Sequence, residues 1–197
     1  MINANADAMG IIFPNNYDKF VPELVSERLM ASIPFASRYR MIDFLLSSMV
    51  GCGIDKIEVL VRENYHSLVD HLGGGREWDL SRKNGGLSIF PPFAQKSIGS
   101  MGGGRVEALA NILPVLKKQK EKYVIMADTN IAANFDFNAL IAQHVKTDAD
   151  ITFAYTKEEL PQELTGAKDA SKGLYYTLKL DGDKVCLLYT SDAADEL

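Results

Sequence analysis

Apolar residues recur along the chain at the two spacings that distinguish strands from helices. Short alternating or continuous apolar runs predict strands, whereas apolar residues three and four positions apart predict amphipathic helices. The predicted strands cover residues 10–14, 56–61, 122–127 and 150–156, of which 122–127 has the pattern of a buried strand. The predicted helices cover residues 38–50, 64–72, 102–119 and 137–145, with Ser37 and Asn64 as the expected caps of the first two.

The order of these patterns indicates the fold class. Strands that alternate with helices are typical of a mostly parallel sheet with helices on both faces and crossovers of the usual hand. We therefore expect an α/β fold with a three-layer arrangement. Two polar stretches, residues 76–87 and 156–173, are predicted loops, and residues 174–185 predict a hairpin that turns at Asp181 and Gly182.

The composition is that of a globular chain able to bury a core. Of the 197 residues, 47% are hydrophobic and 24% are charged, and the formal net charge is −5, which favours one domain. The basic run in residues 116–122 is typical of a solvated helix end, so nothing indicates binding to nucleic acid. Neither a membrane-spanning run nor a secretion signal is apparent, so we expect the protein in the cytoplasm. Cys52 and Cys186 are too few for a disulfide framework.

Candidate chemistry lies where the predicted strands end, because ligands of such sheets bind beyond the carboxyl ends of the strands. Gly103, Gly104 and Arg105 open a helix after a glycine run, where backbone N–H groups are available to a nucleotide phosphate. Asp128 follows another predicted strand, and its carboxylate suits Mg²⁺, which prefers oxygen ligands. Each feature also has a structural interpretation, since glycines form plain connections and the pair Asp128 and Asn130 can cap a loop.

Two blocks of sequence resemble a known family. Residues 33–54, IPFASRYRMIDFLLSSMVGCGI, are similar to the P-F-G-G-R-Y-R-I-I-D-F block of glucose-1-phosphate adenylyltransferases, the ADP-glucose pyrophosphorylases of glycogen synthesis. Residues 76–93, REWDLSRKNGGLSIFPPF, resemble the W-D-L-x-R-x-x-G-G block of the same family. The resemblance implies a Rossmann-like nucleotidyltransferase domain, followed in the family by a left-handed β-helix that is absent here. It also implies a reaction in which ATP and glucose 1-phosphate give ADP-glucose and pyrophosphate, with Mg²⁺ as the cofactor.

The chain departs from the family pattern where phosphate and metal are held. Alignment with the family's L-A-G-G-x-G-x-R-L loop places Asn15 and Asn16 on the paired glycines and Phe20 on the arginine. Asn130 falls on the carboxylate of the family's G-D-H, and Asp128 precedes it by two residues, roughly 6 to 7 Å of extended chain. Loss of one preorganised donor lowers a rate by about 10² to 10³. The glycine loop, the arginine and the metal-binding carboxylate are altered together here, so we expect little or no independent catalysis.

One branch of the family resembles this chain in the same departures. The regulatory-type subunit of two-subunit bacterial ADP-glucose pyrophosphorylases begins M-x-N-x-x-x-x-x-G-I-I-F, close to MINANADAMGIIF here, and lacks the glycine–arginine loop. That subunit pairs with a catalytic subunit and changes its kinetics. The resemblance implies a non-catalytic subunit of a hetero-oligomer, a tetramer, with ATP or a sugar phosphate as ligand. The alternatives are an active adenylyltransferase that uses Asp128 and the loop from Gly102 to Gly104, a remnant pseudo-subunit, or another sugar nucleotidyltransferase.

Other polar residues have candidate or structural roles. Arg38, Arg40 and Arg82 are the basic residues that we expect to contact a phosphate or an anionic effector, and surface ion pairs are the alternative for each. His71 is expected to be exposed or to act in capping. Trp78 is expected to anchor the loop that contains it by packing.

The C-terminal stretch has a separate resemblance. Residues 186–196, CLLYTSDAADE, are similar to a translated transposase sequencing adapter. We therefore expect residues 1–185 to be the N-terminal part of the nucleotidyltransferase domain and residues 186–197 to be a non-native tail. The apolar start of the tail, residues 186–189, still has the character of a strand.

Overall fold

The computed structural model describes five stretches of the chain: residues 7–13, 21–82, 85–90, 105–157 and 176–190. The chain divides into two compact units, Met1–Thr152 and Phe153–Leu197, and each unit is described by itself. Among the helices in these stretches, none combines the length and the apolar character needed to cross a membrane.

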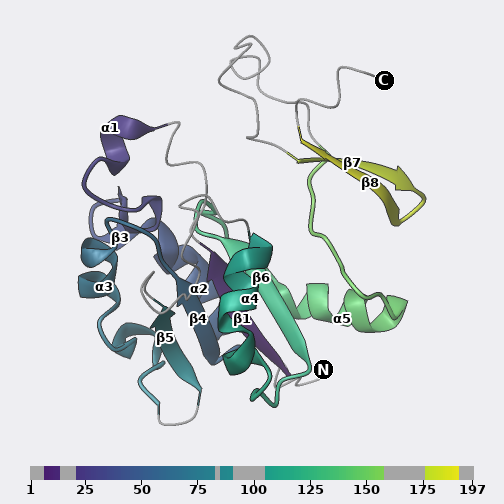
Figure 1. Ribbon diagram of the computed structural model, residues 1–197, viewed down its shortest axis with the longest axis horizontal. Coiled ribbons are helices and arrows are strands. Elements are labelled where there is room, and N and C mark those ends of the chain that lie inside the picture. Colours follow the sequence, from purple (N-terminus) through teal and green to yellow (C-terminus); the bar gives the residue numbers. More distant parts are fainter. Residues whose placement is uncertain (1–6, 14–20, 83–84, 91–104, 158–175, 191–197) are drawn as a thin grey trace. The chain divides into compact units, whose positions relative to one another are not determined.

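Four parallel strands form the sheet of the first unit, in the order β5-β4-β1-β6 (Figure 1). They are β1 (Ala8–Phe13), β4 (Lys56–Leu60), β5 (Gly86–Phe90) and β6 (Tyr123–Asp128). All three pairings are parallel, as the alternation of strands and helices predicts. Strand β1 lies between two neighbours, and all six of its residues are buried.

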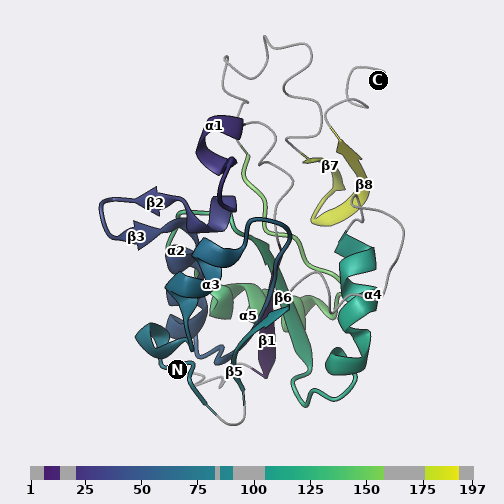
Figure 2. The same cartoon turned by 60° about the vertical axis from the view of Figure 1, so that its left-hand side comes forward.

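Helices cover both faces of this sheet. Figure 2 shows α2 and α3 on one side of the sheet and α4 on the other. The helices are α1 (Pro22–Val25), α2 (Met41–Gly51), α3 (His66–Leu72), α4 (Arg105–Leu116) and α5 (Phe137–Thr147). The smaller elements are the 3₁₀ turns η2 (Met30–Ser32) and η3 (Arg76–Trp78) and a hairpin of β2 (Pro34–Phe35) and β3 (Tyr39–Arg40). The unit therefore has the predicted three-layer α/β arrangement, a Rossmann-like fold.

Alternation along the strands divides the core into two parts, because successive side chains point to opposite faces of a sheet. Ile12 faces α2 and packs in a cluster with Leu46. Ile11 and Phe13 face the other way and pack in a second cluster with Ile112 of α4. All five side chains are at most 2% exposed. Burial of both faces explains why the β1 segment reads as an almost continuous apolar run.

Helices α2 and α3 both begin later than the pattern predicts. Ser37, the expected cap of the first, has a φ of 77° and lies between β2 and β3. The backbone N–H of Arg40 instead donates to the Asp43 carboxylate at 2.9 Å. Asn64, the expected cap of the second, has a φ of 56°. Both cap predictions are wrong because a capping residue normally has an extended backbone, whereas these two residues have left-handed backbones.

Two expectations about strands also need correction. Residues 150–156 alternate like a strand, but they form none in the structure, and Ile151 is 66% exposed. An apolar alternation becomes a strand only where another strand supplies hydrogen-bond partners. Strand β5 begins at Gly86, at the end of the stretch that the sequence predicts to be a loop.

Strand β6 is less buried than its sequence predicts. Val124 and Met126 are 46% and 51% exposed. Their register partners on β1 are Met9 and Ile11, so they share the face of the sheet on which α4 lies. Since β6 is an edge of the described sheet and Ile112 of α4 packs over β1 and β4, this part of the face is left uncovered.

The second unit contains an antiparallel hairpin of β7 (Tyr176–Asp181) and β8 (Lys184–Thr190). Gly182 in the turn has a φ of 59°, a conformation that glycine adopts without steric strain. The predicted hairpin is confirmed. Strand β8 continues past residue 185 into the stretch that resembles an adapter, as the strand character of that stretch predicts.

Candidate functional site

Strands β1 and β6 end side by side at one edge of the sheet, where Phe13 and Asp128 are register partners. This is the carboxyl edge, beyond which ligands bind in open α/β sheets. Helix α4 begins at Arg105, and the Arg105 guanidinium forms an ion pair with the Asp128 carboxylate. The candidate site is therefore this edge, with Asp128 as its acidic group and Arg105 as its basic group.

The Asp128 carboxyl lies in a partly desolvated position. Its side chain is 15% exposed, whereas that of Arg105 is 49% exposed. Burial raises the pKa of Asp128, and the charge and hydrogen bond of Arg105 act in the opposite direction. In such a position one counter-charge has a large influence on the carboxylate, because less water screens the interaction.

The segment that follows β6 is attached to α2. The Ser48 hydroxyl donates to the carbonyls of Phe44 at 2.9 Å and Ala133 at 3.2 Å, and the Phe135 N–H donates to that hydroxyl at 3.2 Å. The Cys52 thiol lies 3.8 Å from the Phe135 carbonyl, within hydrogen-bond range for sulfur. These contacts fix the backbone a few residues beyond Asp128, so α2 helps to position this side of the site.

Asp128 and Asn130 are the two candidates for the position at which the family has a metal-binding carboxylate, and they lie in different places. Strand β6 ends at Asp128, whereas Asn130 lies beyond the strand and is exposed. Asp128 is thus the residue at the edge of the sheet. Five further candidates lie outside the described residues: Asn15, Asn16, Phe20, Gly103 and Gly104.

A magnesium site at this edge would need several oxygen ligands. Mg²⁺ requires octahedral coordination by oxygen, usually one or two carboxylates together with water and substrate phosphates. Among the described residues, no three His, Cys, Asp or Glu side chains are grouped so that they could hold a metal ion. The Asp128 carboxylate is moreover occupied by Arg105. In the part of the chain that the structure describes, Asp128 is therefore not free to act as a magnesium ligand while Arg105 holds its carboxylate.

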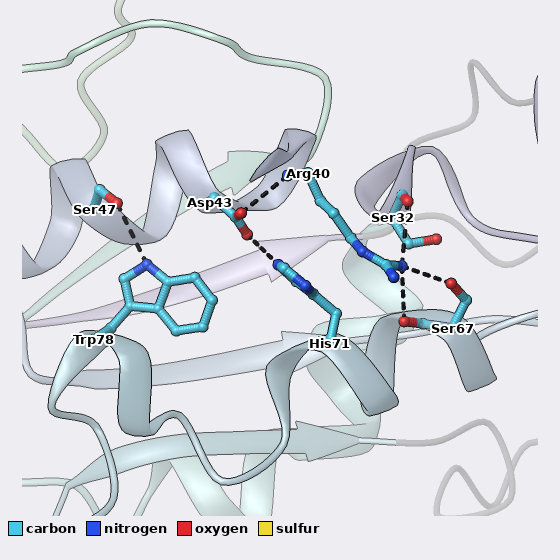
Figure 3. A network of polar contacts seen from close by, with 7 residues as sticks. All are labelled: Ser32, Arg40, Asp43, Ser47, Ser67, His71 and Trp78. Atoms are coloured by element: carbon cyan, nitrogen blue, oxygen red, sulfur yellow. Dashed lines mark hydrogen bonds and ion pairs between the residues drawn. The ribbon is translucent and has the colours of Figure 1, made fainter. Parts of the chain in front are cut away.

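Arg40 is held inside a polar network at the start of α2 (Figure 3). Its Nη1 donates to the Ser67 carbonyl at 2.9 Å, to the Ser67 hydroxyl at 2.6 Å and to the Ser32 carbonyl at 3.4 Å. All three acceptors are neutral oxygens. Arg40 therefore links α2 to α3 and η2 while its positive charge is met by dipoles.

The same network contains a histidine that lies against a carboxylate. His71 Nε2 lies 2.6 Å from Asp43 Oδ1, and its ring meets the edge of Trp78 at a centroid distance of 6.0 Å. The Trp78 indole N–H donates to the Ser47 hydroxyl at 3.3 Å (Figure 3). The expectation that His71 is exposed or capping is wrong, and the expected packing role of Trp78 is confirmed. No local signal pairs His71 with a carboxylate 28 residues earlier in the sequence.

The three arginines proposed for anion binding do not converge. Arg38 is exposed, with its guanidinium carbon 5.2 Å from the centre of the Tyr39 ring. Arg82 forms ion pairs with Asp55 at 2.8 Å and Asp79 at 2.6 Å. Asp55, a partner of Arg82, precedes β4 at the amino edge of the sheet. Arg40 lies at the start of α2, and the 11 residues of this helix separate its two ends by about 16 Å. Arg82 therefore forms surface ion pairs, which is the alternative to anion binding that the sequence leaves open.

The class of protein follows from this architecture. A parallel sheet between helical layers, with an acidic residue at the carboxyl edge of the sheet, is typical of nucleotide-binding α/β domains. Residues 23–166 match the model of the family described as Nucleotidyl transferase. The chain belongs to this family.

Several relatives are more specific. The glycogen biosynthesis protein GlgD of Geobacillus stearothermophilus is 36% identical over 151 residues, which cover 75% of this chain and 43% of that protein. GlgD of Bacillus subtilis is 33% identical over 149 residues, with the same two coverages of 75% and 43%. The glucose-1-phosphate adenylyltransferase of Thermomicrobium roseum is 35% identical over 133 residues, which cover 66% of this chain and 31% of that enzyme. The chain thus spans less than half the length of these relatives.

A solved structure confirms the fold. A Bacillus anthracis protein described as a glucose-1-phosphate thymidylyltransferase, in complex with sucrose, matches with a TM-score of 0.62. The match covers 93% of this chain and 64% of that one, at 14% sequence identity. The fold of the chain is therefore the Rossmann-like nucleotidyltransferase fold.

Proposed function

We propose that the protein is a regulatory, non-catalytic subunit of a glucose-1-phosphate adenylyltransferase that acts in glycogen biosynthesis. Its partner is a catalytic subunit of the same family, which joins ATP and glucose 1-phosphate into ADP-glucose and pyrophosphate with Mg²⁺. The two form a cytoplasmic hetero-oligomer, a tetramer, in which this chain alters the kinetics of its partner.

The similarity to the GlgD proteins supports the pathway and the type of subunit. Both of those relatives carry the name of glycogen biosynthesis proteins, and adenylyltransferases of glucose 1-phosphate match at nearly the same identity. The altered loop positions Asn15, Asn16 and Phe20 support the loss of catalysis, because adenylyl transfer depends mainly on groups that hold phosphates and stabilise charge.

The pairing of Asp128 with Arg105 is the observation that carries the proposal. A catalytic subunit needs a carboxylate that is available to a metal ion at this edge. Here the carboxylate at the end of β6 is neutralised by an arginine, and the two polar side chains that follow, Thr129 and Asn130, carry no charge. A site whose carboxylate is paired with an arginine, and whose sequence lacks the family's glycine loop, is better suited to sensing a ligand than to catalysing adenylyl transfer.

An anionic effector is the ligand that the remaining cations favour. Arg38 lies in the turn of the β2–β3 hairpin and Arg40 ends β3. The described contacts of their guanidinium groups are with neutral groups, the Tyr39 ring and the oxygens of Ser32 and Ser67. We include ATP and sugar phosphates among the candidate ligands. Arg82 is a weaker candidate because two carboxylates already hold it.

One observation favours the alternative of an active adenylyltransferase. Asp128 is in the right place, since it ends β6 beside the end of β1 at the carboxyl edge of the sheet. In that reading, Asp128 and the loop from Gly102 to Gly104 bind the nucleotide, and Arg105 moves away from Asp128 when the nucleotide arrives.

The experiment is reconstitution with the catalytic subunit encoded by the same source. The chain and that subunit are co-expressed, and the complex is compared with the catalytic subunit alone for association by size-exclusion chromatography and for kcat and KM of ADP-glucose synthesis. We expect a stable complex in which the KM for ATP or glucose 1-phosphate, or the kcat, changes at least about two-fold. Failure of the two chains to associate, or kinetics identical with and without this chain, would contradict the proposal.

A further inference from the structure

The ion pair between Arg105 and Asp128 joins two segments that the sequence keeps apart. Arg105 is the first residue of α4, and Asp128 is the last residue of β6, 23 positions later. Strand β6 follows α4 in the chain and runs back along it. The end of β6, with Asp128, therefore lies near the start of α4, with Arg105. Of the two side chains, the carboxylate is the more buried, at 15% against 49% exposure.

An arginine is an unusual neighbour for a carboxylate that is to receive a metal ion. The guanidinium keeps its positive charge at all accessible pH values, and its planar fork matches the two oxygens of a carboxylate. A divalent cation at Asp128 would have to displace this fork and then remain beside a like charge in a partly desolvated position. Binding of the cation is opposed by both effects.

Among the described residues, Arg105 is the charged group that acts on Asp128. In the part of the chain that the structure describes, three His, Cys, Asp or Glu side chains nowhere come together around a possible metal position. The polar residues after Asp128 are Thr129, which is 4% exposed, and Asn130, whose amide is neutral. As far as the described side chains go, a cation here would therefore depend on a carboxylate that is already paired.

We propose that Arg105 acts as an internal counter-ion that takes the place of a divalent cation at Asp128 and keeps this edge of the sheet closed to metal ions. The inference concerns the binding of cations to this chain and goes beyond the proposed function. It holds whether or not the chain assembles with a catalytic partner. It also assigns the exclusion of metal to one residue, so removal of that residue restores binding.

The test uses Mn²⁺, a paramagnetic ion that occupies oxygen sites suited to Mg²⁺. Purified chain, labelled with ¹⁵N, is titrated with MnCl₂, and paramagnetic broadening of the backbone amides of residues 126–130 reports a cation near Asp128. Arg105→Gln removes the charge and keeps a side chain of similar length. We expect the Mn²⁺ concentration that gives half-maximal broadening to fall at least about ten-fold in Arg105→Gln relative to the unsubstituted chain.

Three matched variants make the result specific. Arg105→Lys keeps the charge and should exclude Mn²⁺ as the unsubstituted chain does. The double variant Arg105→Gln, Asp128→Asn should lose the gained binding. Lys146→Gln should leave Mn²⁺ binding unchanged, because Lys146 is an exposed cation in the last turn of α5. Fluorescence of Trp78 verifies that each variant is folded.

Two outcomes would overturn the inference. In the first, the unsubstituted chain binds Mn²⁺ at Asp128 as tightly as Arg105→Gln does. In the second, Arg105→Gln and Arg105→Lys both bind no better than the unsubstituted chain, which would mean that the arginine is not what excludes the ion. Neither outcome would affect the reconstitution experiment, so failure of this inference and failure of the proposed function are distinguishable.

Discussion

Glu58 is a carboxylic acid in the middle of the sheet, and its burial makes stability depend on pH. It lies on β4 opposite Ile11 of β1, and the residue is 3% exposed. The Ser88 hydroxyl on β5 hydrogen-bonds to the carboxyl, but the Oε2 atom has no partner among the described residues. Burial is the largest influence on this group and raises the pKa of Glu58 above its ordinary value of 4.5.

Two other charged groups act on Glu58. Lys56, two residues earlier on the same strand, lowers the pKa of Glu58, and Glu121 raises it. Lys56 Nζ and Glu121 Oε2 are 3.7 Å apart, and the two groups act on Glu58 in opposite directions. The desolvation of the carboxylate therefore dominates.

The sign of the pH dependence follows from the raised pKa. A group whose pKa is higher in the folded state stabilises the fold below its unfolded pKa and loses that contribution as pH rises through its folded pKa. Glu58→Gln has the same shape and cannot ionise. A buried, unpaired polar or charged group costs about 1 to 3 kcal/mol. We expect Glu58→Gln to be more stable than the unsubstituted chain by about that amount at pH 8, and by progressively less toward pH 4.5.

Urea unfolding between pH 4.5 and 8 measures the difference, with the fluorescence of Trp78, the single tryptophan of the chain, as the signal. Glu23→Gln in α1 is the matched control, because Glu23 is exposed and its substitution should not alter the pH dependence. The reasoning is refuted if Glu58→Gln is less stable than the unsubstituted chain at pH 8, or if the difference between the two is the same at every pH.

Two further predictions concern packing. A Cβ atom added at Gly10 would lie 2.7 Å from the Met49 sulfur, so Gly10→Ala should lower the free energy of unfolding by about 1 kcal/mol. A Cβ atom added at Gly51 meets open space, so Gly51→Ala should raise the free energy of unfolding by about 0.5 to 1 kcal/mol. Equal effects of the two substitutions in urea unfolding would contradict this. The exposed apolar side chains of β6 should promote self-association, so the double substitution Val124→Thr, Met126→Gln should lower the apparent mass in sedimentation at high protein concentration, and an unchanged mass would argue against that role.

The central sheet could be predicted because its strands carry their own signal. The segment of β1 is apolar on both faces, as an inner strand of a parallel sheet must be, and the alternation of strands and helices then indicates parallel pairing. Strand β4 differs, because it carries Lys56 and Glu58 on one face. The alternation of Glu58 with apolar neighbours is that of a strand with one polar face, yet Glu58 is buried, and Leu60 on the same face packs with Ile112 of α4.

The features that could not be predicted depend on contacts between distant residues. A helix cap requires a particular backbone conformation, which Ser37 and Asn64 do not adopt. Residues 150–156 need a partner strand that their own sequence cannot supply. The pair of Arg105 and Asp128 shows the same limit at the candidate site, because each residue is a plausible ligand contact by itself and their mutual neutralisation exists only in the folded chain.

The most direct test of the account is ADP-glucose synthesis by a complex whose catalytic partner has been silenced. The complex is assembled with a partner subunit in which the metal-binding carboxylate is replaced by an amide, so that any remaining turnover must come from this chain. ATP, glucose 1-phosphate and Mg²⁺ are supplied, and ADP-glucose is measured against a mock preparation. A non-catalytic regulatory subunit predicts no product above the mock level, and sustained formation of ADP-glucose would contradict it.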